Sequence, residues 1–393
     1  GLKLALIEEI EAHLHPQAQL RLIDFLQNAE TKGQFILTSH STTLASTINL
    51  KNLIICSDNQ TFPMGPEYTK LAESDYSFLE RFLDATKSNL FFARGVILVE
   101  GDAENLLLPT IAEIIGKPLH KYGISIVNVG STAFLRYAKI FMRNDQKKMN
   151  IPVAVITDLD VRPIEYYTDK NSLKDVYCVD DSNIDQLKAI NNDIDFEKIK
   201  GYVFESKTSF EDALRTVNKK KRFPKGFKEK CISIGKFEVS EDSIKTLRIK
   251  KYQQKKKYFS EENVQAFISS KWTLEYDFAL SDLRDYIFKA IIAAKMEKNN
   301  ATVVTDKMFN ETIEKEIKHY YDIWKQEAYS NEKLAYEIYK SLLNGQASKA
   351  TTAQYLAMLL YKDKEKVSPI LKSDTNIKYL VEAIEYVTKG GNN

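Results

Sequence analysis

Short apolar runs alternate with segments of helical spacing along the first 160 residues. The runs end at abrupt polar boundaries, and the segments between them repeat apolar residues every three or four positions, as amphipathic helices do. Strands are predicted over residues 2–7, 34–38, 53–56, 96–99, 124–129 and 152–157. Helices are predicted over residues 17–29, 70–90, 104–116 and 132–143, with a turn-rich stretch at 57–68. Strand–helix–strand alternation of this kind indicates parallel sheets in an α/β protein.

From residue 161 onward the pattern changes. Helical periods are interrupted, and lysines accumulate together with aromatic residues. Further amphipathic helices are predicted over residues 278–295, 307–343, 349–360 and 376–388. The hydropathy pattern therefore predicts two successive α/β units that are followed by a largely helical region.

Composition narrows the class of protein without identifying it. The chain has 393 residues, and 56 basic residues nearly balance 54 acidic ones, so the net charge of +2 indicates no particular partner. Its three cysteines, Cys56, Cys178 and Cys231, form no zinc-binding pattern, which favours a reducing, cytoplasmic location. No apolar run has the length of a membrane span. Because Gly1 leads directly into a strand pattern, we expect the chain to be the C-terminal part of a longer protein.

Two acids end the first predicted strand, and a histidine ends the second. The acids are Glu8 and Glu9, and the histidine is His40. An apolar strand that ends in two acids is the Walker B arrangement, in which one acid holds magnesium and the next polarises the attacking water. The segments IEEIEAHLHPQAQ and ILTSHS resemble the nucleotide-binding domains of ABC-type ATPases, especially the branch related to DNA-repair and chromosome-maintenance ATPases. The resemblance implies that Glu9 is the catalytic glutamate and His40 the switch histidine. The alternative is that these residues only cap strands or lie on the surface.

A phosphate-binding loop of the form GxxxxGK[ST] does not occur in the chain. Gly116 and Lys117 are followed by Pro118 and lack the upstream glycine. We therefore expect the loop to lie upstream of Gly1 and ATP to bind only in the full-length protein. The alternative is that this ATPase segment is a structural remnant.

A second group of acids follows two later strands. Glu100 ends the run VILVE and is followed by Glu104, whereas Asp158 and Asp160 end the run VITDLD. Buried carboxylates are unfavourable unless a cation neutralises them. If the second segment is extended, both of its carboxylates point to the same side. Because ligands bind at the carboxyl ends of parallel strands, the pattern predicts a site for a hard divalent cation. The alternative is an ordinary α/β domain whose acids cap its strands.

These motifs carry a more specific resemblance. VEG with Glu104, together with TDLD, resembles the Toprim domain shared by topoisomerases, primases and a group of nucleases. The resemblance implies that Glu100 is a general base or acid as well as a metal ligand, and that Asp158 and Asp160 hold magnesium. An ABC-type ATPase that runs directly into a Toprim domain resembles the overcoming-lysogenization-defect (OLD) family of nucleases, which includes the Gabija nuclease subunit. This resemblance covers residues 2–56 and 94–160 best.

The OLD family also implies two functional positions further along the chain. A later acidic motif completes a second metal site, and the segment KWTLEYDF is similar to it, which places Glu275 and Thr273 at the metals. Asp277 is the alternative ligand. A lysine beyond this motif supports the transition state, and Lys349 is similar to it, with Arg94 as the alternative cation. The expected cofactors are therefore two Mg²⁺ or Mn²⁺ ions, in addition to ATP in the full-length protein.

A basic stretch in the middle of the chain is a candidate surface for DNA. Its cations are interleaved with aromatic residues, which suits a phosphate backbone with occasional base stacking, although such runs are usually solvated faces. The candidate residues are Lys219, Lys220, Lys221, Arg222 and Lys225.

The predicted fold class is α/β: the end of an ABC-type ATPase sheet, then a Rossmann-like Toprim domain with a largely helical insertion and C-terminal helices. The predicted domains are 1–60 (end of the ATPase domain), 61–93 (helical linker), 94–162 (Toprim core), 163–270 (basic, mostly helical insertion) and 271–393 (C-terminal helical region).

The leading functional hypothesis is a metal-dependent DNA endonuclease or nickase that an ATPase domain regulates, in phage defence or DNA processing. The family also leads us to expect a homodimer or larger homo-oligomer through the ATPase region and a defence-system partner protein, with no membrane contact. Two alternatives remain: a topoisomerase- or primase-like Toprim enzyme, and a non-catalytic, ATP-gated DNA clamp.

Overall fold

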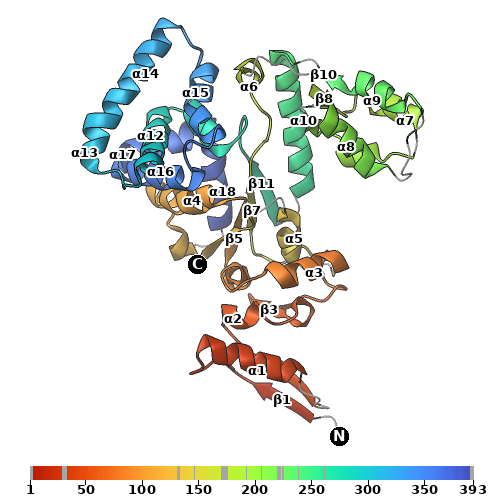
Figure 1. Ribbon diagram of the computed structural model, residues 1–393. Helices are drawn as coiled ribbons and strands as arrows, with labels where there is room; N and C mark the ends of the chain where they lie inside the picture. The colour runs from red at the N-terminus through yellow and green to blue at the C-terminus, as the bar shows by residue number, and fades with distance from the viewer. Residues whose placement is uncertain are drawn as a thin grey trace.

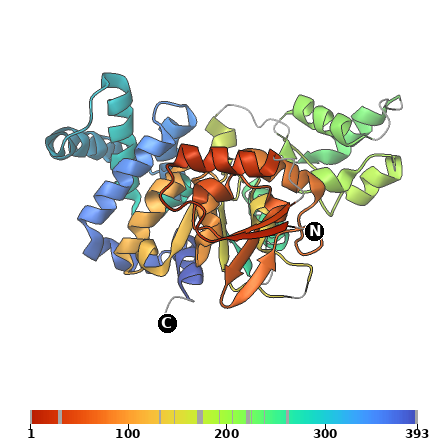
Figure 2. The same ribbon diagram turned by 90° about the horizontal axis from the view of Figure 1, so that it is seen from below.

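The computed structural model describes residues 3–28, 33–130, 133–145, 147–169, 176–191, 193–204, 206–218, 223, 225–237, 239–259 and 263–389. In Figure 1 an N-terminal unit lies at the bottom and a central sheet lies above it. The C-terminal helices and a small unit, coloured green, lie on opposite sides of this sheet, as the view from below in Figure 2 also shows. Within the described ranges, none of the helices combines the length and the apolar character that a membrane span requires.

The N-terminal unit contains one pair of parallel strands, as predicted. Strand β1 (Lys3–Ile7) pairs with β2 (Gly33–Leu37), and helices α1 (Pro16–Asn28) and α2 (Thr42–Ala45) accompany them. Ile10, Ile23 and Leu44 form a small core of their own. The carboxyl ends of β1 and β2 consequently lie at the same edge.

The strand predicted at 53–56 does not continue this parallel pattern. Strand β3 (Ile54–Ser57) forms an antiparallel hairpin with β4 (Gln60–Pro63), which lies in the stretch predicted as turns. Asp58 and Asn59 between them have φ of 50° and 59°, the left-handed conformation of a tight two-residue hairpin turn. The expectation of a third parallel strand was therefore wrong, because this turn folds the chain straight back.

The predicted helix over 70–90 is interrupted. Helix α3 (Glu73–Phe82) ends at Leu83, and a 3-10 helix, η2 (Lys87–Phe92), follows. The Asp84 side chain accepts a hydrogen bond from the Lys87 N–H (2.8 Å) and so starts the second helix. Shorter 3-10 helices elsewhere are η1 (Leu50–Asn52), η3 (Leu119–Tyr122), η4 (Lys139–Phe141) and η5 (Phe196–Ile199).

The central sheet has four parallel strands in the order β11-β7-β5-β6. The strands are β5 (Gly95–Val99), β6 (Ile124–Asn128), β7 (Val153–Thr157) and β11 (Val264–Ile268). Helices α4 (Asp102–Ile114) and α5 (Phe134–Ala138) follow β5 and β6. Every residue of β5 and β7 is buried, and alternate side chains enter different cores on the two faces. Because β6 and β7 lie on opposite sides of β5, a crevice is expected at the carboxyl ends of β5 and β7.

Strand β11 was missed by the sequence analysis, which assigned its residues to a mostly helical insertion. It follows the basic helix α10 (Glu241–Phe259) and pairs with β7, Val264 opposite Val153. A five-residue apolar run beside a charged helix is too short for its periodicity to identify it. Its pairing brings the segment after Ile268 to the carboxyl edge of the central sheet.

The small unit between β7 and α10 is also only partly helical. It contains an antiparallel sheet in the order β10-β8-β9, with its own apolar core. Its elements are β8 (Val176–Cys178), α7 (Ile184–Ile190), β9 (Val203–Phe204), α8 (Lys207–Val217), α9 (Phe227–Gly235) and β10 (Lys236–Phe237), and α6 (Ile164–Asp169) precedes them.

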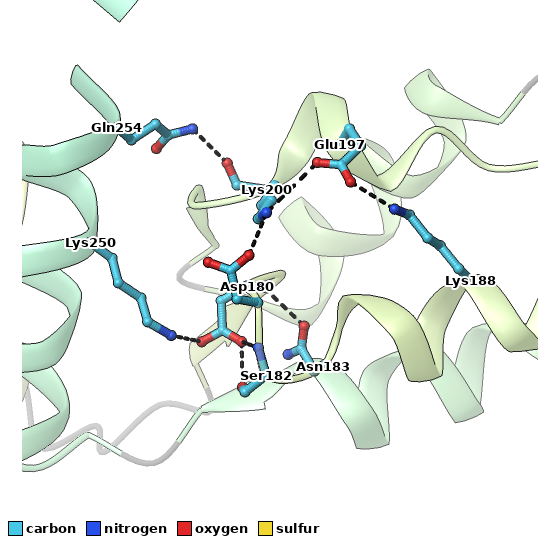
Figure 3. A network of polar contacts seen from close by, with 9 residues as sticks. Asp180, Ser182, Asn183, Lys188, Glu197, Lys200, Lys250 and Gln254 are labelled. Atoms are coloured by element: carbon cyan, nitrogen blue, oxygen red, sulfur yellow. Dashed lines mark hydrogen bonds and ion pairs between the residues drawn. The ribbon is translucent and has the colours of Figure 1, made fainter. Parts of the chain in front are cut away.

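Polar contacts fasten the small unit to α10 (Figure 3). Lys250 Nζ lies 3.0 Å from Asp180 Oδ2, and the Gln254 amide donates a hydrogen bond to the Lys200 carbonyl (2.9 Å). Helix α10 thus contacts both the small unit and strand β11 of the central sheet.

The C-terminal region is helical, as predicted, but with more breaks. Its helices are α11 (Leu274–Leu280), α12 (Arg284–Asn300), α13 (Asp306–Met308), a π-helical turn η6 (Phe309–Ile313), α14 (Glu314–Gln326), α15 (Asn331–Leu343), α16 (Lys349–Lys362), α17 (Lys364–Ser373) and α18 (Lys378–Thr388). The long helix predicted over 307–343 is divided because Ala328 has a φ of 51° and Ser330 caps α15.

Candidate metal and catalytic site

Glu100 and Glu104 flank the start of helix α4. Glu100 follows β5 directly, and Glu104 lies in the first turn of α4, where the helix dipole favours a negative charge. A Cβ atom on Gly101 would lie 3.3 Å from Glu104 Oε2, so the glycine leaves room for that carboxylate. The VEG motif therefore holds two carboxylates at the carboxyl end of β5.

Asp158 follows β7, on the strand next to β5. Its Oδ1 atom accepts a hydrogen bond from the Leu274 N–H (3.0 Å), at the start of α11. The next residue, Leu159, donates its N–H to Ser269 Oγ (2.7 Å). These two bonds join the ends of β7 and β11, so the missed strand β11 positions the TDLD motif.

Asp160 does not continue the strand, contrary to the extended geometry considered for this motif. Its φ is 60°, and its N–H donates to the Trp272 carbonyl (3.1 Å). A left-handed backbone is uncommon for a residue other than glycine and turns the chain here. The Asp160 side chain is 56% exposed, whereas that of Asp158 is only partly accessible. The two aspartates therefore face different surroundings.

Glu275 is brought to the same edge by α11. Its side chain is only 3% exposed, and its Oε2 atom lies 3.0 Å from Lys349 Nζ. Thr273 caps α11: its hydroxyl accepts a hydrogen bond from the Tyr276 N–H (3.3 Å). Lys349 is the first residue of α16 and is 47% exposed. The structure thus pairs the two positions that the OLD resemblance implied, from two separate helices.

The electrostatics of these groups show that they influence one another. Burial raises the pKa of Glu104, and the nearby Glu275 carboxylate raises it further. Burial likewise raises the pKa of Asp158 well above its ordinary value, although Lys349 opposes the shift. For Lys349, burial lowers the pKa, but Glu275, Tyr339 and Asp158 together outweigh this effect and the net pKa is raised. These residues form one carboxylate cluster with a cation at its side.

Glu100 belongs to the same cluster. Burial is the main cause of its raised pKa, and the charge of Asp160 adds to it. Lys255 and Lys349 act in the opposite direction. A carboxylate whose pKa is raised in this way is suited to take up a proton.

Lys255 of α10 is a site residue that the sequence analysis missed. Its Nζ atom lies 2.6 Å from Asp160 Oδ2 and 3.4 Å from Thr157 Oγ1, and it also donates to the Asp158 carbonyl. The sequence shows it only as one lysine in a basic run. Nothing in that run distinguishes the lysine that reaches the end of β7 from its neighbours.

The cluster has the chemistry of a divalent cation site but not yet its geometry. Among the described residues, no three His, Cys, Asp or Glu side chains are arranged to hold a metal ion. Two ammonium groups instead neutralise the cluster, that of Lys255 at Asp160 and that of Lys349 at Glu275. All the acidic groups are carboxylates, which Mg²⁺ and Mn²⁺ prefer, and their mutual repulsion favours a cation. The residues therefore fit such an ion once the lysines withdraw.

Asp277 and Arg94, the two alternative site residues, have positions that differ from those of the cluster residues. Both carboxylate oxygens of Asp277 accept backbone N–H groups of Ser270, Lys271 and Trp272, and its side chain is fully buried. Burial raises the pKa of Asp277 to about 8 against the effect of these bonds. Arg94 precedes β5, at the opposite end of that strand from Glu100. Asp277 thus shapes the loop before α11, and Arg94 is remote from the cluster.

The ATPase motif residues meet at one edge of the N-terminal unit. Glu8 and Glu9 follow β1, His40 follows β2, and all three are exposed. The Glu9 N–H donates to Thr38 Oγ1 (3.1 Å), which ties the two strand ends together. Glu11 contacts the backbone of this histidine: its Oε1 atom accepts a hydrogen bond from the backbone N–H of His40 (2.7 Å). Sequence reasoning did not single out Glu11.

The predicted DNA-binding stretch is largely outside the structural description. Lys219, Lys220, Lys221 and Arg222 lie outside the described residues. Lys225 is exposed and lies just before α9 in the small unit. Its proposed role in DNA binding stays a prediction.

The parallel sheet with acids at the ends of β5 and β7 defines a Toprim-type domain. Residues 91–160 match the family model described as "Overcoming lysogenization defect protein-like, TOPRIM domain", and residues 2–46 match the model of an AAA domain. The chain therefore carries an OLD-like Toprim domain after an AAA-type segment, which confirms the predicted resemblance and fold class.

Curated relatives include two proteins named endonuclease GajA. The one from Bacillus cereus strain HuB5-5 is 27% identical over 262 residues, which cover 54% of this chain and 37% of the relative. The one from strain VD045 is 27% identical over 203 residues, which cover 50% of this chain and 33% of the relative. A retron Ec83 probable ATPase from Escherichia coli is 37% identical over 62 residues, which cover 16% of this chain and 11% of that relative. The chain thus spans about a third of the length of the GajA proteins that it matches.

Solved structures of OLD proteins are also similar to this chain. The C-terminal region of the Burkholderia pseudomallei OLD protein has a TM-score of 0.34 at 20% identity, covering 77% of this chain and all of that one. The C-terminal region of the Xanthomonas campestris pv. campestris OLD protein has a TM-score of 0.33 at 19% identity, and the match covers 77% of this chain and 95% of that one.

Proposed function

We propose that this chain contains the nuclease part of a metal-dependent DNA endonuclease or nickase. The observation that carries the proposal is the cluster of carboxylates at the ends of β5 and β7 and at the start of α11, with Lys349 beside it. The OLD-like Toprim match and the GajA relatives, which are named endonucleases, support the same reaction class.

Each residue has a proposed role in phosphodiester cleavage. Two Mg²⁺ or Mn²⁺ ions would be held by the carboxylates of Glu100, Glu104, Asp158, Asp160 and Glu275, with Thr273 as an additional ligand. Such ions supply Lewis acidity and an acidified water molecule. Glu100, partly buried and with a raised pKa, would accept the proton of the attacking water. Lys349 would move from Glu275 to the scissile phosphate, where a fixed cation stabilises the developing charge.

The N-terminal unit would couple this reaction to ATP in a longer protein. Glu8 and Glu9 would act on magnesium and the attacking water, and His40 would lie near the γ-phosphate. Support comes from the AAA domain match over residues 2–46 and from the common edge of β1 and β2. A role in phage defence or DNA processing and a homodimer through the ATPase region are part of this proposal.

A supercoiled plasmid with Mg²⁺ or Mn²⁺ tests the proposal. The parent chain should nick or cut the plasmid, and Glu100→Gln and Asp158→Asn should not, while Arg94→Gln, remote from the cluster, should cut normally. Relaxed topoisomers without nicks would instead indicate a topoisomerase-like enzyme. Binding without any strand break would indicate a clamp, and equal cleavage by all variants would exclude the assigned site.

A further inference from the structure

A cavity of about 720 Å³ opens beside the carboxylate cluster, between α10 and the small unit. Asp160 and Arg162 line it from the loop after β7, Lys251 from α10, and Tyr202 and Phe204 from the region of β9. Ser206 and Ser209 add hydroxyl groups from the start of α8. Because Asp160 belongs to both, the cavity and the carboxylate cluster are neighbouring parts of one surface.

The charge of this cavity suits an anion. Among the described lining residues, the acidic one, Asp160, is already paired with Lys255, and Lys251 contributes a positive charge. Within the part of the chain that the structure describes, no carboxylate forms an ion pair with Lys251. A second cavity, of about 890 Å³, lies further along α10 but is lined by Glu165, Glu241 and Glu332 as well as by cations. Among the described lining residues, the cavity beside Asp160 thus has one carboxylate, already paired, whereas the second cavity has three.

The cavity also offers an aromatic surface next to its cation. Lys251 Nζ lies 4.7 Å from the centre of the Tyr202 ring, and Tyr202 is 52% exposed. The segment before β9 that carries Tyr202 is held to α10 by the hydrogen bond from the Gln254 amide to the Lys200 carbonyl (Figure 3). A cation and an exposed aromatic ring side by side are the pair that binds single-stranded nucleic acid, through phosphate and base respectively.

We propose that this cavity binds an unpaired nucleotide of the DNA strand next to the phosphate that is cleaved, with Lys251 on its phosphate and Tyr202 stacked on its base. The base must be unpaired because in a duplex its faces are covered by neighbouring bases. This inference rests on the proposed nuclease function and specifies its substrate. It assigns DNA contact to α10 and to the residue before β9, in addition to the predicted stretch 219–225.

Binding of fluorescent oligonucleotides to the full chain in EDTA tests this inference without cleavage. Tyr202→Ala should weaken binding of a short oligo(dT) about tenfold and change binding of a duplex of equal length by less than about twofold. Tyr202→Phe should bind as the parent does. Lys251→Ala should weaken oligo(dT) binding and make the slope of log K against log salt shallower by about 0.7, the loss of one phosphate contact.

Two variants on α10 serve as matched controls. Tyr258 and Lys257 are both exposed, and neither is among the described residues that line the cavity. Tyr258→Ala and Lys257→Ala should therefore bind oligo(dT) with an affinity closer to that of the parent than the cavity variants do. Unchanged oligo(dT) binding by Tyr202→Ala would overturn the inference, as would an equal loss for oligo(dT) and duplex. Plasmid cleavage by the same variants keeps this failure separate from a failure of the nuclease proposal, which Glu100→Gln tests.

Discussion

The ammonium group of Lys349 lies 3.0 Å from the Oε2 atom of Glu275, in a pair that joins the first turns of α16 and α11. Glu275 is almost completely buried, whereas Lys349 is about half exposed. In the absence of a metal ion, the lysine therefore neutralises a carboxylate that would otherwise be buried without a counter-charge.

Loss of this pair should destabilise the metal-free protein. Lys349→Ala is expected to lower the free energy of unfolding by about 1–3 kcal/mol, less than for a fully buried pair because the lysine is partly solvated. Lys349→Arg should recover most of this stability, since it restores the charge. Urea unfolding in EDTA measures both effects, and an unchanged midpoint for Lys349→Ala would show that the pair is not formed.

Lys255 is expected to compete with a metal ion at Asp160, because its ammonium group lies 2.6 Å from Oδ2. Lys255→Ala should bind Mn²⁺ about two- to fivefold more tightly than the parent does, because the metal ion no longer has to displace a partly exposed ion pair. Lys257→Ala, an exposed neighbour on α10, is the matched control and should bind Mn²⁺ like the parent. Weaker Mn²⁺ binding by Lys255→Ala would show that the lysine supports the ion and does not compete with it.

Asp277 should be required for stability, because its carboxylate accepts the backbone N–H groups of three successive residues. Asp277→Asn replaces one acceptor oxygen by an amide donor that would face an N–H group. We expect a loss of about 2 kcal/mol in the free energy of unfolding. A thermal or urea unfolding curve indistinguishable from that of the parent would contradict the role given to this residue.

The pH dependence of stability should reveal the raised pKa of Glu104. A carboxyl group with a higher pKa in the folded state binds more protons when folded, so it stabilises the fold at low pH and loses that contribution as pH rises. Glutamine at this position stays neutral at every pH. In EDTA, the free energy of unfolding of Glu104→Gln should therefore exceed that of the parent by an amount that grows as pH rises from about 4. Added Mn²⁺ should reverse the order, because only the parent has the carboxylate ligand. A stability difference that does not vary with pH would contradict the assigned shift.

The sequence predicted the parts of the site that depend on local pattern. Strands β5 and β7 are continuous apolar runs, so the acids that follow them, Glu100 and Asp158, could be placed at strand ends without a structure. The parallel pairing of β1 and β2 followed from the same reasoning.

The remaining parts depend on contacts between distant segments. Strand β11 is too short to recognise, yet it determines where Glu275 lies. Only the family resemblance suggested Glu275 and Lys349, since no local pattern relates them. The role of Lys255 depends on how α10 packs against β11, which a run of lysines does not encode.

The most direct test of the account is calorimetric titration of the metal-free chain with Mn²⁺, with Asp158→Asn in parallel. Asp158 is partly accessible, follows β7 and lies within the electrostatic reach of Glu104 and Glu275. We expect saturable Mn²⁺ binding by the parent and its loss in a folded Asp158→Asn variant. Equal Mn²⁺ binding by both proteins, or none by the parent at millimolar Mn²⁺, would contradict the claim that these carboxylates form a divalent cation site.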